Sequence, residues 1–287
     1  MQEEQQTTAP LNKPELSKAN RQKEKRFFKS TPISHTIYYL LISFLLYQLV
    51  SVPLPFGEYI HGRSLTFIIF FILFVGIFAT IAIRFAYKSY QEIMTPNVRI
   101  GSRHVNFKQV FKVFAVSLIA VFGFSLLSHL VVSTTENQTF LEKSINVNTA
   151  VGFVVMAVIV APILEELIFR GLLINLIFKD NLFWLPIVVS AAFFAWFHAT
   201  ANIPQYLVYL VIGIILGYAY MKTGRLLTSI LVHMANNLLA TFGFFLSLSA
   251  LDEVLIVAAE IVVIGGLLWF AEKVGLNGEN KPQELNV

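Results

Sequence analysis

The sequence contains no cysteine and few charged residues. Of its 287 residues, 13% are charged and 56% are hydrophobic. The absence of cysteine excludes disulfides and a thiolate nucleophile, so a bound metal would have to be held by nitrogen and oxygen atoms. A mean hydropathy of +0.69 argues against a water-soluble domain. A lipid bilayer is therefore the expected environment for most of this chain.

Long apolar runs recur along the sequence. Most have the 17 to 25 residues that a helix needs to cross about 30 Å of hydrocarbon. Backbone groups in hydrocarbon must satisfy their hydrogen bonds internally, so these runs predict helices. We expect them near residues 33–53, 65–86, 112–133, 149–178, 183–199, 204–221, 226–247 and 253–272. The predicted fold is an all-α polytopic membrane bundle of about eight transmembrane helices.

Positive charge gathers on one side of this predicted bundle. With the N-terminus in the cytoplasm, 18 of the 21 Lys and Arg residues fall in inside loops or tails. Arg63 and Lys143 fall outside, and Arg170 lies within a span. The positive-inside rule therefore predicts a multi-pass protein of the cell membrane with both termini in the cytoplasm. The net charge of +4 is explained by topology, and no nucleic-acid partner is expected.

The composition divides the chain into one membrane domain and two tails. Residues 1–30 are polar and rich in Lys and Arg, which predicts a disordered basic cytoplasmic tail. Residues 31–273 are expected to form a single membrane helical domain, and residues 274–287 a second cytoplasmic tail. Within the domain, Gly213 and Gly217 form a G-x-x-x-G pattern that lets another helix approach closely. Packing within the chain is favoured over dimerisation, and the oligomeric state is left open.

Ionisable side chains occur in spans where they are costly. Such a group near the bilayer centre costs about 2.5 to 3.5 kcal/mol, so it needs a partner or a function. Glu166 and Arg170 are four residues apart on one helix face and can pair. Glu165 points about 100° away and is left free to face another helix. Glu260, in the last span, is expected to hydrogen-bond a neighbouring helix.

Two histidines and an asparagine complete the polar set. His198 follows Phe194 by four residues at the end of the fifth run, and His233 precedes Asn237 by four residues in the seventh. Hydrogen bonding between helices would explain any one of these groups. A carboxylate pair, two imidazoles and an amide at helical spacing in three spans are more than packing requires, so we expect them to meet in the bundle.

The depth of these groups in the bilayer was compared by counting residues. Glu165 and His198 lie at similar distances from the turn at Asp180, so antiparallel helices bring them level. His233 lies only about eight residues from Arg225. It reaches the same depth only if the hairpin at Asp180 protrudes into the cytoplasm.

Three short motifs carry a resemblance to a known family. The patterns E-E-x-x-x-R, F-x-x-x-H and H-x-x-x-N occur in that order between residues 150 and 240. Together they resemble the CAAX protease and bacteriocin-processing (CPBP, or Abi) family of intramembrane proteases. The resemblance implies an eight-helix bundle that uses activated water to hydrolyse peptide bonds, with a protease-like core at residues 149–247.

The resemblance also implies roles for individual residues. Glu165 would be the general base, and His198 would orient the water or share its proton. His233 and Asn237 would polarise the scissile carbonyl and stabilise its oxyanion. Glu166 and Arg170 would hold the site together. These roles make chemical sense, because amide hydrolysis needs an activated water and a stabilised oxyanion.

Participation of a metal stays open at this stage. Glu165, His198 and His233 match a catalytic zinc ligand set with water in the fourth position, so Zn²⁺ is a candidate cofactor. The same three groups can also act without metal, as a glutamate protease.

The leading functional hypothesis is an intramembrane endopeptidase that cleaves a membrane-associated peptide or protein precursor near the cytoplasmic side. The alternative is a bacteriocin immunity or membrane scaffold protein that binds its partner without hydrolysis. A transporter is disfavoured, because the sequence shows no pair of broken helices in matching halves.

Overall fold

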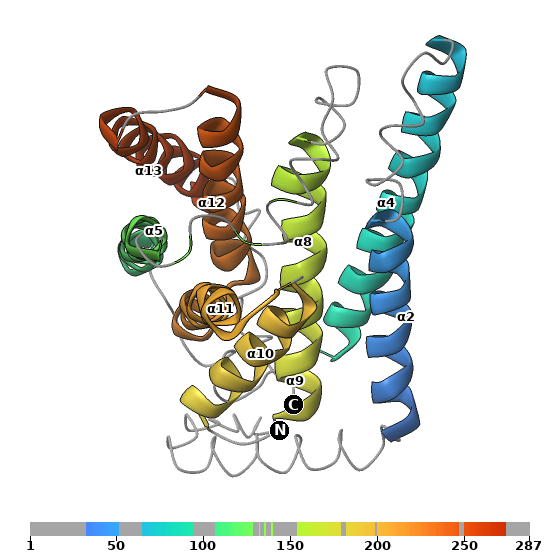
Figure 1. Cartoon of the computed structure of the whole chain (residues 1–287). Helices are drawn as coiled ribbons and strands as arrows, with labels where there is room; N and C mark the ends of the chain where they lie inside the picture. Colours follow the sequence, from blue (N-terminus) through green and yellow to red (C-terminus); the bar gives the residue numbers. More distant parts are fainter. Residues whose placement is uncertain are drawn as a thin grey trace, which may run out of the picture.

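The computed structural model describes a bundle of helices (Figure 1). The described residues are 33–51, 65–93, 107–128, 154–178, 182–198, 200–246 and 250–273, with Val132, Thr135 and Thr139. Both predicted tails, residues 1–30 and 274–287, lie outside these ranges. The described part forms eight helices and contains no strand, which confirms the all-α fold class.

Seven of the eight helices are single elements, and the fourth is composite. The single ones are α2 (Ile33–Ser51), α4 (Leu65–Ile93), α5 (Phe107–Ser128), α10 (Trp184–Phe197), α11 (Ile203–Thr223), α12 (Leu226–Leu246) and α13 (Ala250–Lys273). The composite helix runs without a break through η2 (Met156–Val160), α8 (Ala161–Glu166), η3 (Leu167–Leu173) and α9 (Ile174–Ile177). Its middle carries both glutamates of the first motif.

Two helices differ from their predicted bounds. α4 continues to Ile93 instead of ending near residue 86, and α5 begins at Phe107 instead of residue 112. Tyr90 at the end of α4 and Val110 at the start of α5 are both fully buried in the protein. These turns pack against neighbouring helices, so the helical conformation extends beyond the apolar run that marked it in the sequence.

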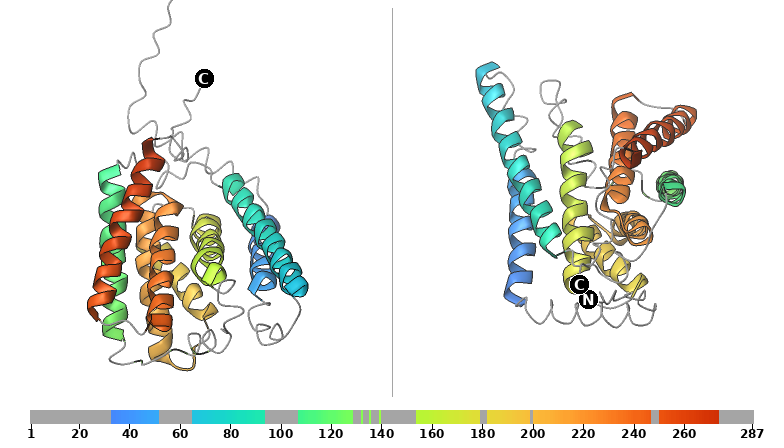
Figure 2. Two further views of the ribbon diagram at one scale, coloured as in Figure 1. Left: turned by 90° about the horizontal axis from the view of Figure 1, so that it is seen from above. Right: turned by 180° about the vertical axis from the view of Figure 1, so that it is seen from behind.

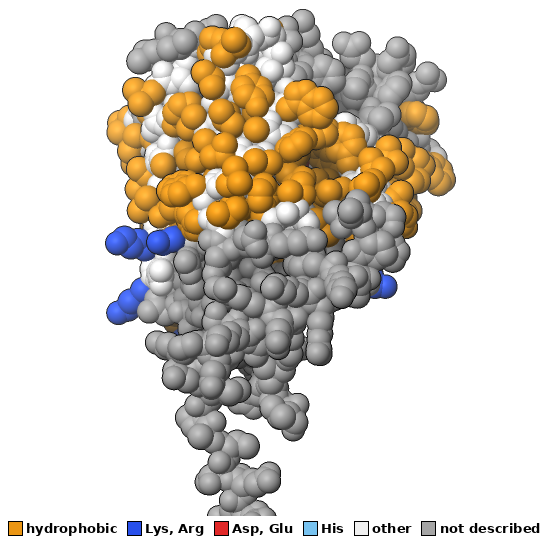
Figure 3. Space-filling model, turned by 90° about the horizontal axis from the view of Figure 1, so that it is seen from below, with side chains coloured by type: hydrophobic (Ala, Val, Ile, Leu, Met, Phe, Trp, Pro, Cys, Tyr) orange, Lys and Arg blue, Asp and Glu red, His pale blue; other side chains and the backbone are white. Residues whose placement is uncertain are grey.

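The outer faces of the bundle are apolar. Large side chains such as Trp196 and Ile203 are 70% and 74% exposed. Most of the other helices also carry exposed large apolar side chains. Figure 3 shows a broad band of apolar side chains with Lys and Arg at its edge. Such a surface is unfavourable in water and favourable in lipid. This is a membrane protein.

Helix length agrees with that environment. Three stretches are long and apolar enough to cross a bilayer, namely Ile72–Gln91, Phe107–Ser128 and Ile203–Thr223. Shorter apolar stretches are found in α2, α10, α12 and α13. Figure 1 shows α5 and α11 nearly end-on and α8 from the side, so the helices cross at steep angles and are not a parallel stack.

The composite helix lies in the middle of the bundle. It contacts α2 and α4 on one side and α10 and α12 on the other. Figure 2 shows the pair α2 and α4 beside it, with α5, α12 and α13 across the molecule. Residues of this helix can therefore contact side chains of α2 and α4 as well as side chains of α10 and α12.

Two π-helical segments flank the turn that carries the glutamates. Pro162 lies in the first turn of α8 and has no backbone N–H, so it cannot donate the usual bond to the carbonyl four residues earlier. Just before it, the N–H of Ala161 bonds the carbonyl of Met156, five residues back. π segments often occur at functional sites because they reorient the adjacent side chains.

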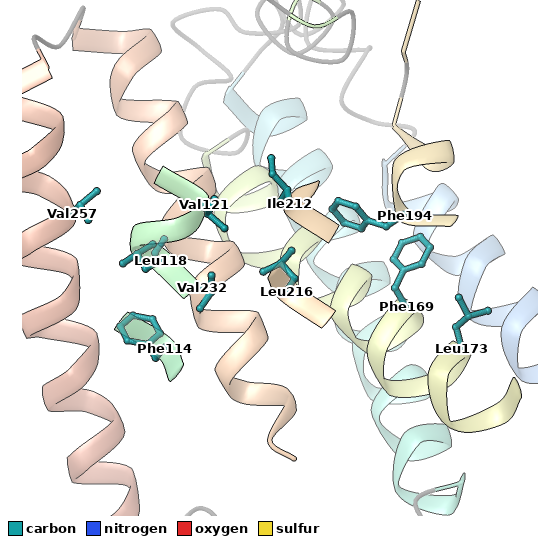
Figure 4. Close-up of a cluster of buried hydrophobic side chains, with 11 residues drawn as sticks. Phe114, Leu118, Val121, Phe169, Leu173, Phe194, Ile212, Leu216, Val232 and Val257 are labelled. Carbon is teal, nitrogen blue, oxygen red and sulfur yellow. The ribbon is translucent and has the colours of Figure 1, made fainter. Parts of the chain in front are cut away.

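The G-x-x-x-G pattern packs two helices of this chain together. A Cβ added at Gly213 would lie 3.0 Å from the Cα of Ala191, and one at Gly217 would lie 3.1 Å from the Cγ2 of Ile187. Both distances are shorter than ordinary contacts, so a larger residue would push against α10. Glycine lets α11 approach α10 closely, as the sequence predicted. The apolar core continues from there towards α5, α12 and α13, where Val257 joins Phe114 and Leu118 (Figure 4).

The prediction for Glu260 was wrong. Its side chain is buried on α13, yet neither carboxylate oxygen has a hydrogen-bond partner in the described part of the chain. α13 packs against α5 and α12, and the core residues at that contact are apolar. These apolar side chains cannot donate a hydrogen bond to the carboxylate.

Candidate active site

Glu166 and Arg170 form a fully buried ion pair. Nη1 of Arg170 donates to Oε1 of Glu166 at 2.8 Å, and both side chains are 0% exposed. Nη2 donates to the carbonyl of Gly213 on α11 at 2.9 Å. The guanidinium carbon also lies 4.7 Å from the centroid of the Phe194 ring on α10. The pair predicted from the four-residue spacing is thus present, and it joins the composite helix to α10 and α11.

His233 lies between the two glutamates. Its Nδ1 is 3.0 Å from Oε1 of Glu166, and its Nε2 is 3.8 Å from Oε2 of Glu165. Glu166 is paired with Arg170 as a carboxylate and can only accept, so Nδ1 carries the proton and donates. In the neutral imidazole, Nε2 then presents its lone pair to Glu165.

His198 caps the end of α10. The helix ends at Phe197, and His198 has extended backbone angles of φ −84° and ψ 135°. Its Nδ1 donates to the carbonyl of Phe194 at 2.8 Å, one of the last carbonyls of the helix. The ring stacks on Tyr209 of α11, with centroids 4.2 Å apart. This contact and the cap fix the ring with Nε2 3.9 Å from Oε2 of Glu165.

The two oxygens of Glu165 have different surroundings. Oε1 accepts a hydrogen bond from the hydroxyl of Tyr47 on α2 at 2.7 Å. Oε2 has no hydrogen-bond partner in the described residues and faces Nε2 of both histidines. With neutral imidazoles, both Nε2 atoms are acceptors that converge on a third acceptor, Oε2 of Glu165. Such a convergence suits a group that donates hydrogen bonds.

Asn237 is held away from this convergence. Its Nδ2 donates to the carbonyl of Ala157 in η2 at 2.9 Å, and its Oδ1 accepts from Asn236 at 3.3 Å. Among the described residues, no hydrogen bond joins it to Glu165 or to either histidine. In this structure the amide ties α12 to η2, and its contact with a substrate stays a prediction.

The candidate zinc ligands were compared with metal geometry. Within the described ranges, no three His, Asp or Glu side chains are placed to hold a metal ion. The nitrogen to oxygen distances from Glu165 to the histidines are 3.8 and 3.9 Å. Ligand atoms on one tetrahedral zinc would be about 3.3 Å apart. The donor atoms are of the types that zinc binds, but the distances between them are longer than a zinc site requires.

Two residues near the site have no counterpart in the sequence analysis. Tyr47 hydrogen-bonds Glu165 although 118 residues separate them, and Tyr209 stacks on His198. No motif contains either tyrosine. The helical spacing that revealed the other residues relates positions on one helix, whereas these two contacts join different helices.

The steep helix crossing removes the depth problem of His233. Counting residues assumed helices parallel to one another, and it placed His233 too shallow to meet Glu165. In the structure the two side chains are 3.8 Å apart. The Asp180 turn lies outside the described residues, so the predicted protrusion of that hairpin is not tested.

A comparison with known families places this geometry in context. Residues 147–239 match the family model described as type II CAAX prenyl endopeptidase, Rce1-like. The resemblance to the CAAX protease family is confirmed. The Rce1-like segment covers about a third of the chain and contains Glu165, Glu166, Arg170, both histidines and Asn237. No curated protein and no solved structure shows a significant match.

The match supports a general activity. Rce1-like proteins are a protease family, so the match supports a CAAX-type endopeptidase activity in general. The Rce1-like segment includes none of the helices α2, α4, α5 and α13.

Proposed function

We propose that this chain hydrolyses a peptide bond of a membrane-associated substrate, with Glu165 as the general base. One observation carries the proposal: Oε2 of Glu165 has no hydrogen-bond partner among the described residues and lies within 3.9 Å of Nε2 of both histidines. A carboxylate oxygen buried without a donor is unfavourable for stability. Its presence is explained if a water molecule uses it during catalysis.

The spacing suits a bridging water. Distances of 3.8 and 3.9 Å are too long for direct hydrogen bonds and short enough for one water molecule to bridge. Such a water donates one proton towards Oε2 of Glu165 and the other towards Nε2 of His198. Both bonds orient the oxygen lone pair away from the acceptors and towards a scissile carbonyl.

The proposed reaction keeps its protons within the site. The water oxygen bonds to the carbonyl carbon while its proton passes to Oε2 of Glu165. The carbonyl oxygen becomes an oxyanion, which accepts from the second amide hydrogen of Asn237. In the imidazolium form of His233 it also accepts from Nε2–H of that ring, while Nδ1–H stays bonded to Glu166. Glu165 then returns its proton to the departing amine as the carbon–nitrogen bond breaks.

Glu166 and Arg170 support this chemistry without touching the substrate. Glu166 fixes the Nδ1 proton of His233 and so sets which nitrogen faces the reaction. Arg170 neutralises Glu166 and ties it to α11 through Gly213. We also propose that both termini are cytoplasmic and that cleavage occurs near that face, because Lys88, Lys108 and Lys222 lie near helix ends that the topology puts inside.

The test compares two buried glutamates in membrane helices. Glu165→Ala should lower the rate of cleavage about 10² to 10⁴-fold, because it removes the general base. Glu260→Ala, a change on α13 outside the matched residues 147–239, should cleave at the wild-type rate. The probe is an internally quenched peptide with a farnesylated CAAX end, assayed with the full-length protein in lipid nanodiscs. Cleavage by Glu165→Ala at the wild-type rate would exclude this base.

The same assay decides between the two forms of the mechanism. A metal-free glutamate protease keeps its activity after treatment with 1,10-phenanthroline and contains no stoichiometric metal by elemental analysis. Loss of cleavage that added Zn²⁺ restores would instead assign Glu165, His198 and His233 as metal ligands.

A further inference from the structure

The first helix contributes one polar side chain to the site. The hydroxyl of Tyr47 donates to Oε1 of Glu165 at 2.7 Å. Tyr47 lies on α2, which is outside the Rce1-like segment at residues 147–239 but packs against α8 and η3 of the composite helix. The helix α2, which is not part of the family match, therefore contacts Glu165, the proposed base.

This hydrogen bond distinguishes the two oxygens of Glu165. The terminal torsion of a glutamate side chain is broad and roughly two-fold, so a free carboxylate can present either oxygen. A donor on Oε1 fixes the plane of the group and leaves Oε2 as the oxygen near both histidines. Bonds from a hydroxyl to a carboxylate are short and strong, which suits this restraint.

No other group in the described part of the chain does the same. The helix α10 presents His198 and α12 presents His233, both towards Oε2 of Glu165. On the composite helix itself, Nη1 and Nη2 of Arg170 bond Glu166 and the carbonyl of Gly213. Among the described residues, Tyr47 alone donates a hydrogen bond to Glu165.

We propose that Tyr47 is a positioning residue that orients the Glu165 carboxylate and presents Oε2 to the catalytic water. The inference rests on the proposed role of Glu165 as general base. It extends the working unit beyond the Rce1-like segment, because α2 supplies a contact that the segment lacks. The ring of Tyr47 is not required for this role; the hydroxyl is.

The first measurement needs no substrate. Infrared difference spectra between wild type and Glu165→Gln identify the carboxyl bands of Glu165 in the full-length protein. Tyr47→Phe keeps the ring and removes the hydroxyl, and it should shift those bands. Tyr38→Phe is the matched control, because Tyr38 is on the same helix and 52% exposed on the outer face. Bands that stay unmoved in Tyr47→Phe would overturn the proposal.

The second measurement separates positioning from packing. With the quenched farnesylated peptide, Tyr47→Phe should lower kcat about tenfold and leave KM unchanged, since the hydroxyl bonds the base and not the substrate. Tyr38→Phe should match wild type in both constants. A Tyr47→Phe protein with wild-type kcat, in a preparation where Glu165→Ala is inactive, would also overturn the proposal.

The two failures are distinguishable. If Glu165→Ala cleaves normally, the proposed function is wrong, whatever the infrared spectra show. If Glu165→Ala is inactive and Tyr47→Phe changes neither the spectra nor kcat, the base is correct and the positioning role is wrong. A monodisperse size-exclusion peak for each variant excludes misfolding as the cause of a lower rate.

Discussion

Glu165 and Glu166 are adjacent in the sequence but have opposite surroundings. Glu166 is fully buried, bonded to Arg170 at 2.8 Å and to His233 at 3.0 Å. Glu165 has one oxygen that accepts from Tyr47 and one oxygen that lies 3.8 and 3.9 Å from Nε2 of the two histidines. The satisfied carboxylate fixes the helices and the partly satisfied one is available for chemistry. Two adjacent glutamates on one helical turn thus have different roles, one in stability and the other in the proposed reaction.

The largest loss of stability should come from breaking the ion pair between Glu166 and Arg170. Arg170→Ala leaves the Glu166 carboxylate buried without its counterion, and losing one partner of a buried pair costs about 3 to 5 kcal/mol. The apparent melting temperature should fall strongly. It is measured by heating the detergent-solubilised protein and quantifying the monomer peak that survives in size-exclusion chromatography.

Glu165→Ala is the matched change at the partly bonded glutamate. It removes the carboxylate that accepts from Tyr47 and also removes an unpaired oxygen. The two effects oppose each other, so the stability should change by only about 1 kcal/mol. Equal destabilisation by Arg170→Ala and Glu165→Ala would show that both glutamates are structural. The distinction drawn between them would then be lost.

A middle-sized effect is expected where α11 approaches α10. Gly213 provides the carbonyl that accepts from Arg170, and a Cβ there would lie 3.0 Å from the Cα and the Cβ of Ala191. Gly213→Ala must separate the two helices, at a cost of about 1 to 3 kcal/mol. The same thermal assay should therefore detect a lower melting temperature than in wild type.

Gly76→Ala controls for the change of residue type. Gly76 lies within α4, and a Cβ there would have no atom within 4 Å. Alanine is the better helix former, so this variant should be as stable as wild type or slightly more stable. If the two alanine variants behave alike, the close contact between α10 and α11 does not contribute to the fold.

The same comparison shows how far the sequence could predict the site. The Glu166–Arg170 pair follows from a four-residue spacing, and the separate direction of Glu165 follows from the angle between adjacent helical residues. Both are properties of one helix. The glycine pattern was equally local, since it describes one face of α11 and was correct about close packing within the chain.

Contacts between helices were beyond that reasoning. Nothing in the spacing of α2 relates Tyr47 to Glu165, because the relation depends on how distant helices cross. The bond from Asn237 to Ala157 likewise depends on the π-helical segment η2 next to Pro162, a departure from the regular helix that the spacing assumes. The expected hydrogen bond of Glu260 failed for a similar reason, because a donor from a neighbouring helix depends on how the helices pack.

The smallest effect concerns this third buried carboxylate. Glu260 has no hydrogen-bond partner for either oxygen in the described part of the chain, and α13 packs there through apolar contacts. Glu260→Leu has similar size and no polar atoms, so it should stabilise the protein by about 1 kcal/mol. A higher melting temperature with an unchanged cleavage rate is the expected result.

Glu166→Leu is the informative control, because it removes another buried carboxylate, one that does have partners. It should destabilise strongly, since Arg170 and His233 both lose their acceptor. The sign of the change, and not the degree of burial, then separates a paired from an unpaired glutamate. If Glu260→Leu is less stable than wild type while Glu260→Gln is not, the carboxylate accepts a hydrogen bond that an amide can replace. The apolar description of the contact between α13 and its neighbours would then be wrong.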